Sequence, residues 1–142
     1  MSVNVYYDQI KYRIRKTGEI KRFLEKVIRD EKKIPGDLVF ILTNDEKMLE
    51  INRKFLKHYY HTDVISFDYS AEGEINGEIY LSVDTIRKNA LKYKSGISEE
   101  LLRVMIHGVL HLCGYNDGNK DDRDKMFARQ EEKVSEFENR SE

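Results

Sequence analysis

Two histidines four residues apart stand in the otherwise apolar segment HGVLHLCGYND, which runs from His107 to Asp117. At this spacing, two side chains lie one helical turn apart on the same face of a helix. Buried imidazoles need polar partners, because an unsatisfied buried polar group costs on the order of 1–3 kcal/mol. A metal ion satisfies both rings at once, and helical zinc sites use this HxxxH spacing. The pair therefore predicts a metal site.

A third ligand is expected from the chain that follows the two histidines. Gly114 can end the helix in a left-handed conformation and turn the chain back. Asp117 comes six residues after His111 and is the obvious third ligand. We therefore expect His107, His111 and Asp117 to bind the metal and to act in catalysis through it. The alternative to a metal site is that the two histidines donate hydrogen bonds to main-chain carbonyls. Asp117 would then lie in a loop or cap a helix.

The pattern HxxxHxxGxxD has the spacing of the metzincin peptidases, HExxHxxGxxH, with two substitutions. Gly108 stands where those enzymes have their glutamate base, and Asp117 stands where they have a third histidine. Without the glutamate, peptide hydrolysis by their route has no evident base, so a metallopeptidase is disfavoured. Two histidines and a carboxylate also form the ligand set of non-haem iron oxygenases, but nothing else in the sequence indicates a cosubstrate site.

The segment that carries the two histidines is predicted to be a central, buried helix. Apolar residues cover nearly the whole circumference of a helix over residues 98–113. Further helices are indicated from Thr17, from Asn44 to about residue 56, over residues 85–94, and from about residue 121 to 138. Strands are indicated at residues 3–7, 38–42, 64–67 and 78–83, with turns at residues 35–37, 70–74 and 76–77.

This order of elements predicts an α+β fold. The last two strands are expected to pair as a hairpin. The chain then forms one mixed β-sheet of about four strands that is backed by helices. A length of 142 residues is the usual size of one domain, so residues 1–142 are expected to form a single domain.

Composition limits where the protein acts and what it binds. Charged residues make up 36% of the chain, and no apolar run approaches the roughly 20 residues of a membrane span. The N-terminal sequence lacks the apolar core of a signal peptide, and the single cysteine, Cys113, cannot form an internal disulfide. We expect a soluble, cytoplasmic protein without a membrane partner. Ten basic and four acidic residues between Lys11 and Lys33 can present a basic face to a polyanion, although a solvated helix face is as good an explanation.

Three segments resemble the YbeY family of bacterial endoribonucleases. HGVLHLCGYND is similar to the family signature HGxLHLxGYDH. LEINRKFLKHYYHTDVISF resembles the segment that has an asparagine and an aromatic residue before a TDVLSF-like strand, and GEIYLSVDTIRKNA resembles a GDI-type strand with its following helix. The resemblance covers roughly residues 49–133. It implies a zincin-like domain with one zinc ion that acts in the cytoplasm on ribosomal RNA, in small-subunit rRNA processing and ribosome quality control.

The resemblance also assigns roles to single residues. His107 and His111 match the first two metal ligands, and Asp117 stands where the family usually has a histidine. An anionic ligand makes bound water less acidic and favours harder metals, so another divalent metal is an alternative to zinc. Leu56 stands where the family usually has an arginine, a residue suited to binding phosphate.

Residues around Leu56 are candidates for contacts with RNA. Histidine titrates near neutral pH and its ring can stack on unpaired bases. Asp63 stands in the Thr-Asp position of the family and is either catalytic or fixes the start of a strand. The other candidates are Arg53, Lys54, Lys57, His58 and His61. The alternative for each of these residues is an exposed position with no role in catalysis.

Two functions follow from these observations. The first is a metal-dependent endoribonuclease of rRNA maturation, whose metal polarises the phosphoryl group or activates water. The attacking group is then metal-bound water or the 2′-hydroxyl of the RNA. The second is a non-catalytic ribosome assembly or RNA-binding factor with a structural metal. The reasons to consider it are the missing arginine and the missing helix glutamate.

Overall fold

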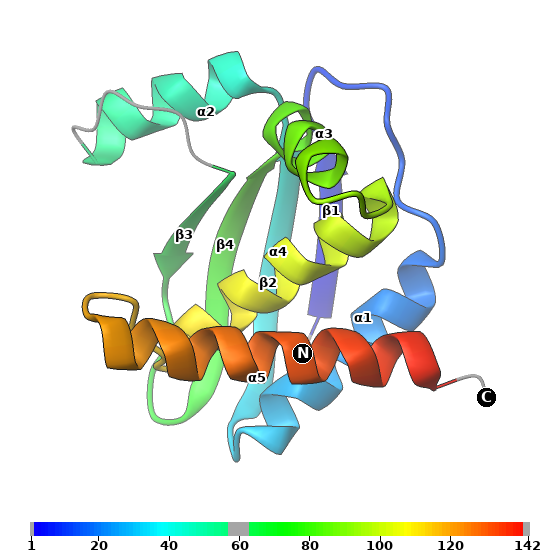
Figure 1. Ribbon diagram of the computed structural model, residues 1–142. Coiled ribbons are helices and arrows are strands. Elements are labelled where there is room, and N and C mark those ends of the chain that lie inside the picture. Colours follow the sequence, from blue (N-terminus) through cyan, green and yellow to red (C-terminus); the bar gives the residue numbers. More distant parts are fainter. Residues whose placement is uncertain (1, 57–62, 141–142) are drawn as a thin grey trace.

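The computed structural model describes residues 2–56 and 63–140 and contains a four-stranded sheet with helices packed on it (Figure 1). The strand order is β1-β2-β4-β3. β1, β2 and β4 run parallel, and β3 pairs with β4 as an antiparallel hairpin. The predicted α+β fold with a mixed sheet is confirmed. The strands are β1 (Ser2–Tyr7), β2 (Ile34–Thr43), β3 (Val64–Asp68) and β4 (Glu74–Ser82).

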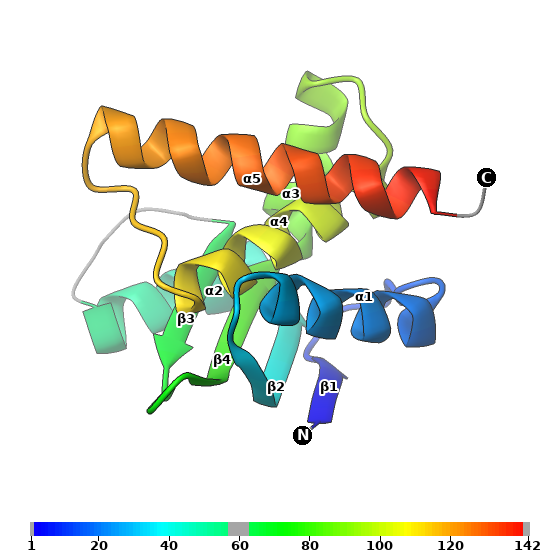
Figure 2. The ribbon, with the colours of Figure 1, turned by 90° about the horizontal axis from the view of Figure 1, so that it is seen from below.

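α1, α4 and α5 form two layers on one face of the sheet. α1 and α4 pack on the sheet, and Figure 2 shows α5 on the side of α4 that faces away from it. α2 packs on the opposite face, where Met48 and Ile51 cluster with Ile65 of β3. None of the described helices is long and apolar enough to span a membrane. The helices are α1 (Thr17–Asp30), α2 (Asp45–Ile51), which continues as a π-helix (Asn52–Leu56), α3 (Val83–Lys92), α4 (Ile97–Leu112) and α5 (Lys120–Asn139).

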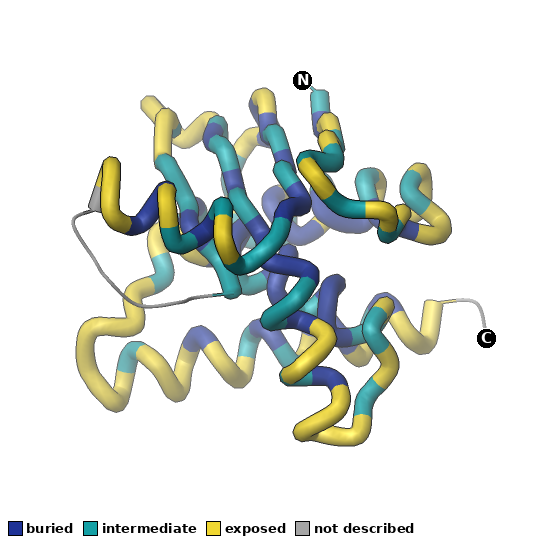
Figure 3. The backbone as a smooth tube through the Cα atoms, turned by 90° about the horizontal axis from the view of Figure 1, so that it is seen from above, coloured by how far each residue is buried: buried dark blue, intermediate teal, exposed yellow. Residues whose placement is uncertain are grey.

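α4 lies at the centre of the molecule, as its apolar circumference predicts. It contacts α1, α3, α5, β3 and β4, and the buried residues gather where these elements meet (Figure 3). Gly108 lets α4 approach the sheet closely, because a Cβ at this position would lie 3.1 Å from two side-chain carbons of Ile79 in β4. The residue that replaces the metzincin glutamate therefore faces the sheet, where a carboxylate would be buried.

Two of the predicted turns are strand residues instead. Pro35 and Gly36 belong to β2, and Asn76 and Gly77 belong to β4. The pairing of β2 with β4 shifts register after Pro35, and the Asn76 side chain accepts a hydrogen bond from the main-chain N–H of Asp37 at 2.7 Å. A Cβ on Gly36 would lie 2.7 Å from the Ile75 carbonyl oxygen. The small and polar residues thus allow β2 and β4 to approach closely at a β-bulge. A bulge favours the same residue types as a turn, which explains the wrong prediction.

Candidate functional site

The end of α4 is the left-handed turn that the sequence predicts at Gly114. This residue has φ 111° and donates its N–H to the His111 carbonyl at 3.1 Å. The N–H of Tyr115 donates to the Leu110 carbonyl at 3.2 Å. Together these two hydrogen bonds form a Schellman motif, which closes the last turn of the helix and reverses the direction of the chain.

The three predicted metal ligands differ in burial. His107 is half-buried, whereas His111 and Asp117 are exposed. The expectation of two buried imidazoles is therefore wrong for His111, which lies in the last turn of α4 on a side that is open to solvent. The apolar residues beside it in the sequence occupy the other sides of the helix.

His107 and Asp117 line one cavity of about 300 Å³, at the junction of α4 and the start of α5. His111 does not belong to the lining of this cavity. Within residues 2–56 and 63–140, no three His, Cys, Asp or Glu side chains are placed together as a metal-binding group. The structure thus brings His107 and Asp117 to one cavity. His111 lies outside this cavity, one helical turn further along α4.

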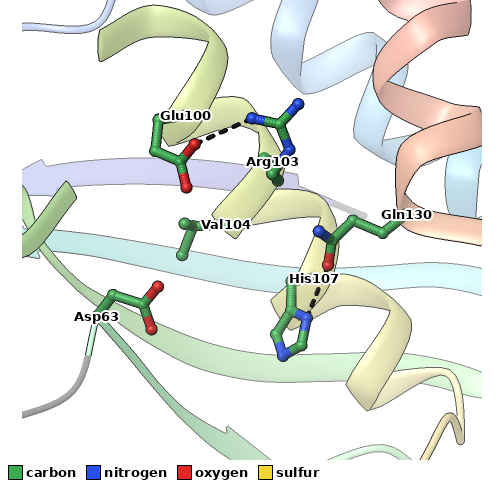
Figure 4. A pocket seen from close by; sticks show the side chains of 6 residues that line it. All are labelled: Asp63, Glu100, Arg103, Val104, His107 and Gln130. Carbon is green, nitrogen blue, oxygen red and sulfur yellow. Dashed lines mark hydrogen bonds and ion pairs between the residues drawn. The ribbon is translucent and has the colours of Figure 1, made fainter. Parts of the chain in front are cut away.

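Hydrogen bonds between α4 and α5 hold the ring of His107 in one orientation (Figure 4). The His107 Nδ1 atom lies 2.8 Å from Oε1 of Gln130, whose Nε2 donates to a carboxylate oxygen of Glu131 at 3.1 Å. Because a carboxylate only accepts, the nitrogen of the Gln130 amide must face Glu131 and its oxygen must face His107. Nδ1 of His107 therefore carries a proton, and Nε2 is the ring nitrogen that is left for another partner.

Arg103 anchors the far end of this chain of hydrogen bonds. Its guanidinium donates two hydrogen bonds to Glu131, at 2.8 and 3.0 Å, and one to the buried Glu100 at 2.9 Å. The hydrogen bond with Glu131 raises the pKa of Arg103. Burial raises the pKa of Glu131, but hydrogen bonds from Arg103 and Gln130 outweigh it, so the net shift of this pKa is downward. Both groups stay charged at neutral pH and fix the position of Gln130.

Asp63 faces His107 from the other side of a second cavity (Figure 4). Its carboxyl group points into this space, which Glu100, Arg103 and His107 also line. Burial raises the pKa of Asp63, and the electrostatic interaction with the His107 ring lowers it by less. The main-chain carbonyl of Asp63 accepts a hydrogen bond from the N–H of Ser82 at 3.0 Å. Asp63 thus extends the hairpin with its main chain and presents an acid to the site with its side chain.

The candidate RNA contacts of the sequence lie elsewhere or outside the described residues. Arg53 is exposed in the π-helix and lines a separate cavity with Lys54. The side chain of Leu56 is not described, and Lys57, His58 and His61 lie outside the described residues.

Sequence reasoning missed the contribution of α5 to the site. Gln130 orients His107, and Arg123, Met126 and Phe127 line the cavity that His107 shares with Asp117. These residues recur at intervals of three and four, which places them on one face of a helix. That spacing could have marked them as a group, but it does not say which part of the protein they face.

Comparison with known proteins gives matches over most of the chain. A family model described as Endoribonuclease YbeY matches residues 4–138. An endoribonuclease YbeY of Flavobacterium psychrophilum is 43% identical over 129 residues, which are 91% of this chain and 92% of the relative. One of Parabacteroides distasonis is 39% identical over 126 residues, which are 89% of each chain.

A solved structure extends the similarity to the fold. A solution structure from Thermotoga maritima has a TM-score of 0.68 and 26% identity, and the match covers 96% of this chain and 89% of that chain. The family model and the two relatives name the same family, and the solved structure shows that the fold is shared. The chain belongs to the YbeY family of endoribonucleases.

Proposed function

We propose that the chain is a single-domain, metal-dependent endoribonuclease that cleaves ribosomal RNA during maturation of the small ribosomal subunit. The reaction is supported by the relatives, which are named endoribonucleases. The observation that carries the site is the hydrogen bond from His107 Nδ1–H to Gln130, which leaves Nε2 as the ring nitrogen that can bind a metal; His107 and Asp117 line the same cavity. The proposed substrate is ribosomal RNA, the proposed partner is the small ribosomal subunit, and the proposed compartment is the cytoplasm.

The donor types of the proposed ligands fit zinc. A metal-binding histidine commonly gives its other ring N–H to an acceptor, as His107 does with Gln130. His111 is exposed one turn later, and the Asp117 carboxylate supplies an oxygen donor. We propose zinc as the ion, and the mixed nitrogen and oxygen set also suits another divalent metal. When bound, the metal supplies a Lewis acid for the phosphoryl group and lowers the pKa of water.

The residues of the chain divide the remaining work. Gln130 keeps the proton of His107 on Nδ1, and Arg103 and Glu131 hold Gln130 in place. The Asp63 carboxyl group lies across the cavity from His107, where it can accept the proton of the attacking hydroxyl group.

Exposure distinguishes the catalytic role from a structural metal in an assembly factor. Structural zinc sites are closed by four protein ligands, whereas catalytic sites keep one position open to water or substrate. His111 and Asp117 are both exposed. An ion bound to these side chains would be accessible to water and to a phosphate oxygen, which favours the endoribonuclease.

Metal removal tests the proposal. The purified chain is stripped with a chelator, shown to be metal-free by mass spectrometry, and incubated with ribosomal RNA. We expect cleavage to stop. It should return on addition of one equivalent of zinc, or of another divalent metal if zinc is not the native ion. Undiminished cleavage by the metal-free chain would contradict metal dependence. Depletion of the protein in its host, followed by mapping of rRNA ends, tests the substrate, and unchanged ends would contradict it.

Substitution of Gln130 tests how the proposed metal site is held. In Gln130→Met, the His107 Nδ1–H loses its acceptor while the side-chain volume is nearly kept. We expect zinc affinity to fall about 10–100-fold, the usual cost of losing such a partner. Nitrogen NMR of the metal-free protein should then show both tautomers of His107 instead of the Nδ1–H form. Ser135→Met, at an exposed position of α5, is the control, and equal zinc affinities in the two variants would refute this role.

A further inference from the structure

One wall of the cavity that His107 shares with Asp117 has no part in the proposed metal chemistry. Arg123, Met126 and Phe127 of α5 form this wall. Arg123 and Phe127 are four residues apart, so their side chains are neighbours on one face of the helix. A cationic group and an aromatic ring thus stand together beside two of the proposed metal ligands.

The ring of Phe127 is available for stacking. It is 61% exposed, whereas its neighbour Met126 is only 1% exposed and belongs to the core. A single exposed phenylalanine is common on protein surfaces. Phe127 differs because it lines a cavity next to a proposed RNA-cleaving centre, and aromatic rings in such places stack on unpaired bases.

The guanidinium of Arg123 is available for an anion. Its Nη1 donates to the main-chain carbonyl of Asp117 at 3.3 Å, and the structure gives it no ion pair within the described ranges. The nearest acids along α5 have other partners: the Asp122 carboxylate accepts from Asn119 and the Asp124 carboxylate accepts from Lys120, both at 2.9 Å. A guanidinium of this kind can bind two oxygens of one phosphate group.

We propose that Arg123 and Phe127 form a nucleotide subsite beside the metal centre. Arg123 binds a backbone phosphate of the RNA, and Phe127 stacks on the base of one unpaired nucleotide. The cavity of about 300 Å³ is at the small end of ligand sites, which suits one nucleotide rather than several. The inference rests on the proposed function, and it gives the chain an arginine for phosphate although position 56 is a leucine.

Three variants of α5 test the subsite on a single-stranded oligoribonucleotide. Arg123→Gln and Phe127→Leu change the proposed contacts, and Lys125→Gln is the matched control, because Lys125 lies on the same helix but lines a different cavity. We expect Arg123→Gln and Phe127→Leu to raise KM about tenfold or more, with a smaller change in kcat. The control should match the wild type, and all of the variants should bind zinc as the wild type does.

Two binding measurements separate the phosphate contact from the base contact. The slope of the logarithm of the binding constant against the logarithm of salt concentration should shrink by about 0.7 in Arg123→Gln and stay unchanged in Phe127→Leu, because only the first loses a phosphate contact. An abasic nucleotide at the stacked position should weaken binding to the wild type and have little effect on Phe127→Leu.

The outcomes distinguish this inference from the proposed function. If Arg123→Gln and Phe127→Leu equal Lys125→Gln in KM and in salt slope while the wild type cleaves RNA, the subsite is refuted and the endoribonuclease stands. If the wild type binds RNA without cleaving it, the salt slopes still decide the subsite and the proposed reaction fails. A loss of zinc in Arg123→Gln would assign the residue to the metal centre and would also refute the subsite.

Discussion

RNA cleavage by His111→Ala is expected to fall by more than about 100-fold while the chain stays folded. Loss of a residue that only orients a metal ligand already costs about 10–100-fold, so loss of a proposed ligand should cost more. His111 is exposed, and its removal leaves the core intact. The measurements are the rate of rRNA cleavage, metal content by mass spectrometry, and the thermal unfolding midpoint.

A matched variant separates the loss of a ligand from a general disturbance of this region. Asn116→Ala removes an exposed polar side chain next to Asp117 and should cleave like the wild type. His107→Ala should also lose cleavage, but it leaves Oε1 of the buried Gln130 without its hydrogen-bond donor and should cost stability as well, on the order of 1–3 kcal/mol. Undiminished cleavage in His111→Ala would sink the assignment of this residue.

Gly77→Ala is expected to lower the free energy of unfolding by about 3 kcal/mol, the upper part of the usual range for overpacking. A Cβ at this position would lie 2.7 Å from the carbonyl oxygen of Phe67 in the paired strand β3. It would also lie 2.9 Å from Cδ1 of Leu112, the last residue of α4. The strand pair or the helix must move, and neither can move without disturbing the core. Urea denaturation measures the effect.

The two neighbours of Gly77 can be tested apart. The double variant Gly77→Ala with Leu112→Val relieves the side-chain contact and leaves the contact with the Phe67 carbonyl, so it should recover only part of the lost stability. Gly118→Ala is the control, since nothing lies within 4 Å of a Cβ there, and it should change stability by less than about 0.5 kcal/mol. A Gly77→Ala protein as stable as this control would disprove the close packing of α4 on β4.

The fold could be predicted where each pattern lies within one segment. The apolar circumference of α4, the short apolar strands and the hairpin of β3 with β4 are all confirmed. The predicted turns at residues 35–37 and 76–77 are wrong, because these residues belong to β2 and β4 and lie where the two strands contact each other. The hydrogen bond from the N–H of Asp37 to the Asn76 side chain spans 39 positions of the sequence, and no local pattern indicates it.

The site divides in the same way. His107, His111 and Gly114 lie within one helix and its end, so their spacing predicted a common helical face and the left-handed turn. Gln130 and Arg123 come from another helix, and their nearness to His107 depends on how α5 packs against α4. The roles of His107, His111 and Asp117 as metal ligands stay predictions, as does the identity of the metal.

The central place of α4 also decides which parts of the site can move. Amide protons of a helix that packs on the sheet and on three other helices exchange with solvent only when the whole core opens, so the backbone that carries His107 and His111 belongs to the slowest-exchanging part of the protein. Asp117 lies among the exposed residues Asn116, Gly118 and Asn119, beyond the Schellman turn. The packing of α4 therefore fixes the backbone positions of the two histidines, and we expect the exposed segment around Asp117 to adjust when a ligand binds. Capture and release of a ligand would be read in the exchange of residues 116–119 and not in that of the helix.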